Sequence, residues 1–338
     1  MRIPLMRMAA VTLAVASSAV AGCSWFAVAT APAKLAQPTD DHGRAVAAQF
    51  WDALHAGAYE RIDALLESHA QVLVATPGDA STAAHKGWLH AWRLAERARA
   101  APAARITEHA TLARVLFDDA ARLKPEDARI LGFAAGFTMT EATIAGDQKA
   151  LRRGYYRMKD AVAAFPEFNL FTSGYTMSSG ASDSAAFREG LEQQWATLDV
   201  CFGERVARQS PRLDKYLALR TTEGTKRVCW NSWIAPHNWE GFFLNFGDML
   251  ARARDLPNAR AMYEAARLSE TYSQWPWREV LERRLAHLDE LPDRLERAAA
   301  DEREWTPMVK SAFACSGCHQ AVGAPALQGG AVASTASR

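Results

Sequence analysis

Apolar residues recur at helical spacing along most of this 338-residue chain, and that period limits the fold more than any other feature. Trp88, Ala91 and Trp92, for example, lie on one face of a helix with 3.6 residues per turn. Glycines and prolines fall at distances that suit helical hairpins, and no series of alternating strands appears. The sequence therefore predicts an all-α fold. Helices are expected at 127–145, 147–164, 184–208, 239–254, 257–269 and 277–299, with a loop at 172–184 that is either a lid or an insertion.

A pattern of large and small residues between positions 243 and 266 predicts two antiparallel helices. The small residues let the helices approach, and the large apolar ones fill the space between them. The pattern resembles one tetratricopeptide repeat of about 34 residues. The matching residues are Phe243, Phe246, Gly247, Leu250, Ala259, Tyr263 and Ala266, and a half-match is formed by Ala113, Phe117, Ala120 and Pro125. The resemblance implies a tetratricopeptide-like stack of helical hairpins over 41–300, and a generic helical bundle is the alternative.

The beginning of the chain has the features of an export signal. A short basic segment with Arg2 and Arg7 precedes an apolar run that is shorter than a transmembrane helix usually needs to span the bilayer. We predict a signal peptide at 1–22 and a tether at 23–40. At the other end, the Gly-, Ala- and Ser-rich residues 323–338 predict a disordered tail.

The apolar run ends in Val20-Ala21-Gly22-Cys23, which resembles the lipobox of bacterial lipoproteins. The resemblance implies cleavage before Cys23 and lipidation of that cysteine. Ser24 stands where an aspartate usually retains such proteins at the inner membrane, so a periplasm-facing outer-membrane anchor is expected. The alternative is cleavage after Ala29, which would leave a soluble periplasmic protein.

Close to the C-terminus stands the sequence Cys315-Ser316-Gly317-Cys318-His319. C-x-x-C-H is the attachment signature of c-type haem. We expect the thiols of Cys315 and Cys318 to add to the haem vinyl groups and His319 to become the proximal ligand of the iron. The segment 301–322 therefore predicts a site for one covalent haem c.

Zinc binding and dithiol redox chemistry are the other uses of a CxxC pair. Zinc requires two further ligands, and the sequence has no second CxxC or closely spaced HxxxH. A thioredoxin-like pair belongs to a βαβ pattern, which does not occur here. Both uses, like a chance CxxC, are less consistent with this chain than haem attachment.

Cys201 and Cys229 remain after the lipid and haem assignments. In an oxidising compartment they are expected to form a disulfide. The alternative is a pair of buried free thiols. Neither residue indicates catalysis.

Thr306-Pro307 has the form of a helix N-cap followed by proline, so one helix is expected from 306 to 320. On that helix Met308 would lie about 16 Å from His319, which excludes both from ligating one iron. We expect Met308 and Phe313 to pack at the edge of the haem. A sixth iron ligand would come from elsewhere, with His237 as the first candidate. The other candidates are Met249, Met262 and His287.

A haem-attachment helix at the C-terminus is similar to that of the class II (c′-type) cytochromes. The resemblance covers about thirty residues and carries over to Cys315, Cys318 and His319 alone. It implies a proximal histidine and leaves the distal side of the iron open. The common small cytochrome c arrangement is excluded, because no methionine or histidine follows His319.

Two functions fit these features. The first is a membrane-anchored periplasmic monohaem cytochrome that exchanges electrons with a protein docked on the helical stack. The second is an assembly or scaffold lipoprotein in which haem is structural, gas-sensing or absent. Loss of Arg2 and Arg7 with the signal peptide changes the formal charge from +1 to −1, so no basic excess indicates nucleic acid. The sequence contains no phosphate-binding loop or hydrolytic motif, which favours electron transfer or binding over enzymatic activity.

Overall fold

The computed structural model describes residue 30 and residues 33–100, 103–221, 223–230, 238–298 and 304–321. The predicted signal peptide, Cys23, His237 and the C-terminal tail lie outside these residues. The chain divides into a unit of residues Met1–Leu35 and a unit of residues Ala36–Arg338, and the described helices all belong to the second. In the ranges given, all regular structure is helical, which confirms the all-α prediction. Within those ranges, the helices are too short or too polar to span a bilayer.

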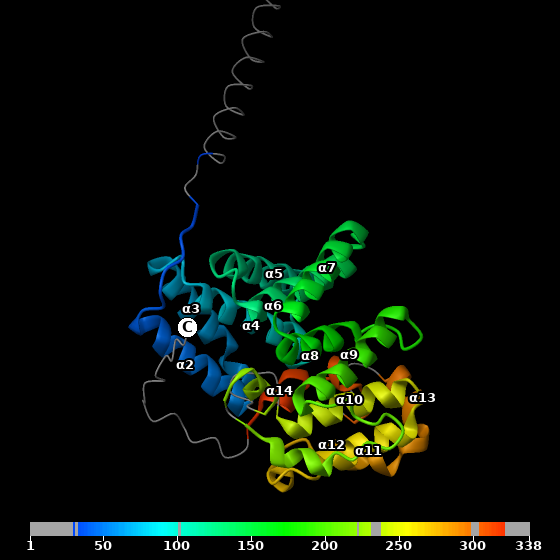
Figure 1. Ribbon diagram of the computed structural model, residues 1–338. Helices are drawn as coiled ribbons and strands as arrows, with labels where there is room; N and C mark the ends of the chain where they lie inside the picture. The colour runs from blue at the N-terminus through cyan, green and yellow to red at the C-terminus, as the bar shows by residue number, and fades with distance from the viewer. Residues whose placement is uncertain are drawn as a thin grey trace, which may run out of the picture. The chain divides into compact units, whose positions relative to one another are not determined.

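The first part of the fold consists of long helices joined by short turns (Figure 1). These are α2 (Asp41–Ala56), α3 (Ile62–Ala75), α4 (Ala80–Ala95), α5 (Ile106–Leu123), α6 (Ala128–Ala145), α7 (Gln148–Ala164), α8 (Pro166–Met177) and α9 (Ala185–Phe202). Aspartates at 40, 79, 127 and 147 cap α2, α4, α6 and α7 by accepting backbone N–H groups of the first turn. The capping carboxylates explain why these helices begin where they do.

The second part has shorter helices and several 3₁₀ turns. The helices are α10 (Trp239–Arg252), α11 (Leu256–Ala266), α12 (Arg278–Ala286), α13 (Leu291–Arg297) and α14 (Ala314–His319). The 3₁₀ turns are η1 (Tyr59–Arg61) and η2 (Arg97–Arg99) in the first part, then η3 (Asp214–Leu219), η4 (Thr225–Cys229), η5 (Tyr272–Gln274), η6 (Leu288–Glu290) and η7 (Met308–Lys310).

Consecutive helices pack as hairpins. The most extensive contacts join α4 to α5, α6 to α7, α8 to α9 and α10 to α11. Contacts between α3 and α4 and between α5 and α6 stack neighbouring hairpins on one another. The predicted stack of helical hairpins is therefore present.

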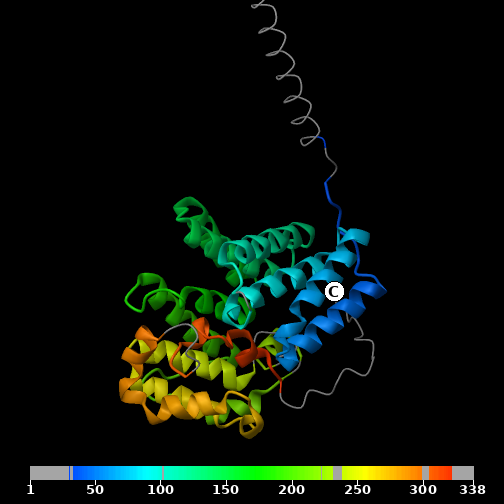
Figure 2. The same cartoon turned by 180° about the vertical axis from the view of Figure 1, so that it is seen from behind.

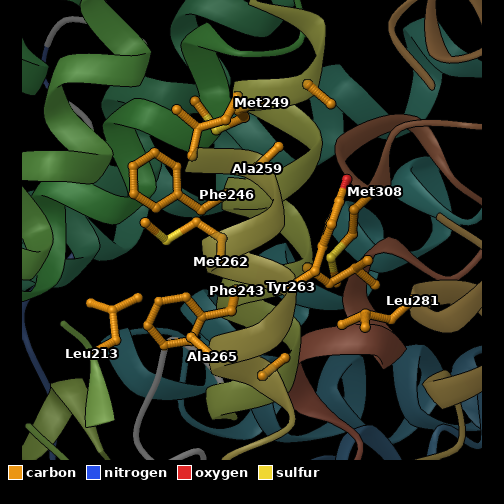
Figure 3. Close-up of a cluster of buried hydrophobic side chains, with 14 of the residues drawn as sticks. Leu213, Phe243, Phe246, Met249, Ala259, Met262, Tyr263, Ala265, Leu281 and Met308 are labelled. Atoms are coloured by element: carbon orange, nitrogen blue, oxygen red, sulfur yellow. The ribbon is translucent and has the colours of Figure 1, made fainter. Parts of the chain in front are cut away.

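The α10–α11 hairpin contains the close approach that the repeat pattern predicts. A Cβ atom at Gly247 would lie 2.3 Å from Cε1 of Tyr263, so only glycine fits at this position. Tyr263 is fully buried, and its hydroxyl donates to the Asp248 carboxylate at 2.8 Å. Figure 3 shows the surrounding core, where Tyr263 lies beside Met308 from the C-terminal segment.

The region 172–184 differs from the predicted loop, because its first half belongs to α8. The serine and threonine side chains there bond within the helix, as when the Thr176 hydroxyl donates to the Thr172 carbonyl at 2.8 Å. Gly174 faces Gly190 of α9, where an added Cβ would meet a backbone carbonyl at 2.8 Å. The absence of a side chain at Gly174 thus allows α8 and α9 to touch.

Two other helices end earlier than the sequence predicts. The helix expected at 184–208 ends at Gly203, whose φ of 76° is left-handed. The helix expected at 277–299 divides into α12 and α13, and Pro292 lies in the first turn of α13. Proline lacks the N–H that an uninterrupted helix would need there.

The prediction of a single helix at 306–320 is also wrong. The segment forms the turn η7, an extended residue Ser311 with ψ of 158°, and then the short helix α14. The N–H of Met308 donates to the buried Asp248 carboxylate at 2.7 Å, and the N–H groups of Cys315 and Ser316 donate to Glu96. These tertiary hydrogen bonds replace the local ones that a continuous helix would make.

Cys201 and Cys229 form the expected disulfide, with Cα atoms 5.9 Å apart. The bond ties the end of α9 to η4, and both cysteines pack with the core around Phe202 and Phe243. The bridge closes a loop with a sequence separation of 28 residues.

We predict that the free energy of unfolding of a Cys201→Ser/Cys229→Ser variant is about 3–4 kcal/mol lower than that of the wild type, because the unfolded chain regains the conformational entropy that the closed loop had lost. Denaturant titration of the two proteins measures the difference. Reduction of the wild type with dithiothreitol should produce a similar loss. An unchanged midpoint after verified reduction would contradict the prediction.

Candidate functional site

The Cys315–His319 motif occupies the short helix α14, which contacts α2, α4 and α10. In both overall views α14 lies in the interior, between the N-terminal helices and α10 (Figures 1 and 2). The motif thus joins the two parts of the fold, although its residues come from the end of the chain.

Glu96, the residue that follows α4, holds the first turn of α14. Its side chain is completely buried, and Oε1 accepts the N–H groups of Cys315 at 3.1 Å and Ser316 at 2.8 Å. The Ser316 hydroxyl donates to the same oxygen at 3.0 Å, and Arg99 donates to Oε2 at 2.8 Å. A carboxylate at this place satisfies N–H groups that a helix leaves open and complements the positive end of its dipole.

The other end of α14 is held by the start of α10. The N–H of Asn238 donates to the Cys318 carbonyl at 2.8 Å, and the indole N–H of Trp275 donates to the Gly317 carbonyl at 3.2 Å. A Cβ atom at Gly241 would lie 2.6 Å from Cα of Cys318, so the two helices approach as closely as a glycine permits. The motif backbone is therefore fixed at both ends.

A buried ionic group anchors the residues that lead into the motif. Asp248 on α10 pairs with Arg284 on α12, at 3.1 Å, and accepts the N–H of Met308. Arg284 also donates to the Thr306 carbonyl at 2.6 Å. Removal of either charged partner would leave the other buried without its counter-charge, which makes this group a rigid support for the segment.

A cavity of about 540 Å³ lies against α14. Cys315, Cys318 and His319 form one part of its wall, and α4, α6 and α8 supply most of the remainder. Its aromatic members are Trp88, Phe133, Phe137, Phe171 and Tyr175. The size and the apolar wall are typical of small-molecule and cofactor sites, whose volumes run from about 300 to 1,000 Å³.

His319 is 5 % exposed, and its ring lies edge-on to Trp88 with centroids 6.0 Å apart. Burial lowers the pKa of His319 to about 3, with a smaller contribution from His55. The imidazole is therefore neutral at physiological pH, which is the form that binds metal ions.

The two thiols of the motif are also uncharged at physiological pH. Burial raises the pKa of Cys315 well above its ordinary value, and the nearby Glu96 carboxylate raises it further. Burial likewise raises the pKa of Cys318.

The wall of the cavity fits a flat apolar ring that is attached to α14. Ile106 and Ile144 line the cavity and are 37 % and 41 % exposed, so an apolar occupant would cover part of their surface. Two thiols and a neutral imidazole from one short helix are the donor set of a c-type haem. The residues present are compatible with that group.

The structure places three of the four candidate sixth ligands away from this cavity. Met249 and Met262 are buried in the α10–α11 core, and His287 is exposed at the end of α12. His237, the first candidate, lies outside the described residues. In the described part of the cavity wall, His319 is the single histidine and no methionine occurs.

Met308 and Phe313 also differ from expectation. Neither lines the cavity, and both pack against the opposite side of α14, around Gly317. Phe313 stacks on Trp277 with ring centroids 4.5 Å apart. The break at Ser311 turns both side chains into the core.

Sequence reasoning did not identify Glu96 or Tyr175 as parts of the site. Glu96 lies 219 residues before Cys315, and no local pattern links the two. Tyr175 lines the cavity from the part of α8 that was expected to be a loop. Burial raises the pKa of Tyr175 well above its ordinary value, with contributions from Cys315 and Cys318, so its hydroxyl keeps its proton.

No group of three or more His, Cys, Asp or Glu side chains is placed to hold a metal ion within the part of the chain that the structure describes. Comparisons of the chain with protein-family patterns, curated proteins and solved structures found no match.

We predict that Glu96→Ala lowers the free energy of unfolding by about 3 kcal/mol, because it leaves the buried N–H groups of Cys315 and Ser316 without an acceptor. Glu96→Gln retains one acceptor oxygen and should cost less. Glu60, an exposed residue of η1, provides the control, and Glu60→Ala should leave stability unchanged. Chemical denaturation of the three variants measures their free energies of unfolding and so their order of stability. Equal stability of Glu96→Ala and Glu60→Ala would refute the anchoring role.

Proposed function

We propose that this chain is a c-type haem protein, in which thioether bonds from Cys315 and Cys318 hold one haem and His319 ligates its iron. One observation carries the proposal. The three side chains of the motif meet in the wall of one apolar cavity, whose other side is lined by aromatic rings. Neither a chance CxxC nor a zinc half-site accounts for an apolar cavity of this size beside the motif.

A bound haem supplies one-electron redox chemistry at its iron. The chain's own residues would hold that group and exclude water from it. Glu96 and Asn238 fix the motif backbone, and the ring of Trp88, which itself packs on Phe133, lies against His319. Fixed ligand orientation and an apolar shell are two means by which proteins set the properties of a metal centre.

We assign to the protein the transfer of single electrons to or from a periplasmic partner. The predicted export signal and lipobox support a membrane-anchored periplasmic location, where haem is attached. The half-exposed Ile106 and Ile144 support access for a partner, because they place part of the cavity wall at the surface. The stack of helical hairpins is a suitable docking surface.

Binding of a small gas molecule at the iron is the second candidate. Tyr175 favours it, because its protonated hydroxyl belongs to the cavity wall and can donate a hydrogen bond there. The two candidates predict different spectra.

We predict that the protein carries one covalent haem when it is produced with a haem-maturation system. Intact mass and absorption spectra of the wild type should show the haem, and a Cys315→Ala/Cys318→Ala variant should lack it. The Cys201→Ser/Cys229→Ser variant is the matched control and should keep the haem. A wild type whose mass matches the haem-free chain would overturn the proposal and leave a helical scaffold lipoprotein.

We further expect that carbon monoxide leaves the spectrum of the reduced protein unchanged, because an electron-transfer centre keeps a sixth protein ligand. A rapid spectral change on addition of carbon monoxide would support gas binding instead. Tyr175→Phe should then accelerate ligand dissociation, because it removes one hydrogen-bond donor from the cavity.

A further inference from the structure

Two cationic residues, Arg97 and Lys310, belong to the lining of the apolar cavity, and both reach the solvent-exposed part of its wall. Arg97 belongs to η2, just after α4, and Lys310 ends η7, a few residues before the motif. The other titratable side chains of the wall are neutral at physiological pH. In the described part of the wall no aspartate or glutamate occurs. The wall therefore suits an apolar ligand that carries negative charge at its periphery.

Neighbouring arginines show what is unusual about Arg97. Arg93 pairs with Asp63, and Arg99 pairs with the buried Glu96 at 2.8 Å. Arg97 lies between them in sequence, lines the cavity and makes no ion pair with any residue that the structure describes. Of these three arginines, Arg97 is therefore the one whose guanidinium remains available to a ligand.

Lys310 is placed similarly at another part of the wall. Arg252 on α10 and Glu296 on α13 face it, but these two residues pair with each other at 3.0 Å. Lys310 itself makes no ion pair within the described ranges. Burial and the positive charge of Arg252 both lower the pKa of Lys310. A carboxylate from a ligand would offset this repulsion.

We infer that Arg97 and Lys310 bind the two propionate carboxylates of the haem, an inference that rests on the proposed function. A guanidinium can make paired hydrogen bonds to a carboxylate, and an ammonium can make a charge-assisted one. The cations would stabilise the propionates and orient the ring within the cavity. Because positive charge near the ring disfavours ferric iron, both residues would also raise the midpoint potential of the haem.

The test is a charge series on the mature, haem-loaded protein. Lys310→Arg and Arg97→Lys keep the positive charge, Lys310→Gln and Arg97→Gln remove it, and Lys310→Glu reverses it. Intact mass establishes that each variant carries haem, and spectroelectrochemistry measures its midpoint potential. Lys149→Gln, an exposed position on α7 outside the cavity wall, is the matched control.

We expect the potential to fall with each lost positive charge, to fall further for Lys310→Glu, and to stay near the wild-type value for Lys310→Arg and Lys149→Gln. Potentials that do not change in fully loaded Arg97→Gln and Lys310→Gln proteins would overturn the inference while leaving haem attachment intact. A wild type without haem would instead overturn the proposed function and this inference with it.

A second measurement separates carboxylate binding from a general effect of charge. The Cys315→Ala/Cys318→Ala protein, which cannot form thioethers, is titrated with haemin and with haemin dimethyl ester. We expect about a tenfold preference for haemin, the size of one charge-assisted contact, and loss of that preference when Arg97→Gln and Lys310→Gln are added. Equal affinity for both porphyrins in the presence of both cations would contradict the inference. If neither porphyrin binds this protein, the midpoint potentials of the haem-loaded charge variants decide whether the inference holds.

Discussion

The buried carboxylate of Glu96 is the interaction on which the arrangement of this molecule depends. It joins the end of α4 to the first turn of α14, across a sequence separation of 219 residues. Without it, two N–H groups of the motif would be buried with no acceptor, and Arg99 would lose its partner. Because the carboxylate is fully buried, its hydrogen bonds are not screened by water and are correspondingly strong. The interaction therefore attaches the C-terminal motif to the N-terminal helices.

The C-terminal helices hold the same motif from the opposite side. Asn238 and Trp275 bond to carbonyl groups of α14, and the Asp248–Arg284 pair fixes the turn before it. As a result, one face of α14 is packed into the core around Met308, and the other faces the apolar cavity. A short helix that is fixed on three sides presents its thiols and imidazole in one orientation. This rigidity would suit the proposed haem, whose attachment and iron ligation would both involve this helix.

Much of the helical architecture follows from local sequence, and particular residues show where local reasoning stops. The Gly247–Tyr263 contact could be predicted from spacing, because it acts between two adjacent helices. The helix α8 was missed because its serines and threonines resemble those of a loop, whereas in the structure they bond within the helix. The break at Ser311 was missed because the acceptors that cause it, Asp248 and Glu96, come from distant parts of the chain.

In the candidate site, too, some features follow from the local sequence and others only from the tertiary structure. The sequence by itself determined the all-α class and the identity of the motif side chains, since each depends on residue type and spacing along the chain. It also predicted the Cys201–Cys229 disulfide, because these two cysteines remained when the other three had been assigned. Only the tertiary structure decided that these side chains face an apolar cavity, that Tyr175, Arg97 and Lys310 share its wall, and that Met249, Met262 and His287 do not. The physical reason is that a cavity wall is assembled by packing. Its members come from helices whose relative positions no local pattern encodes, and buried polar anchors such as Glu96 select one of the possible arrangements.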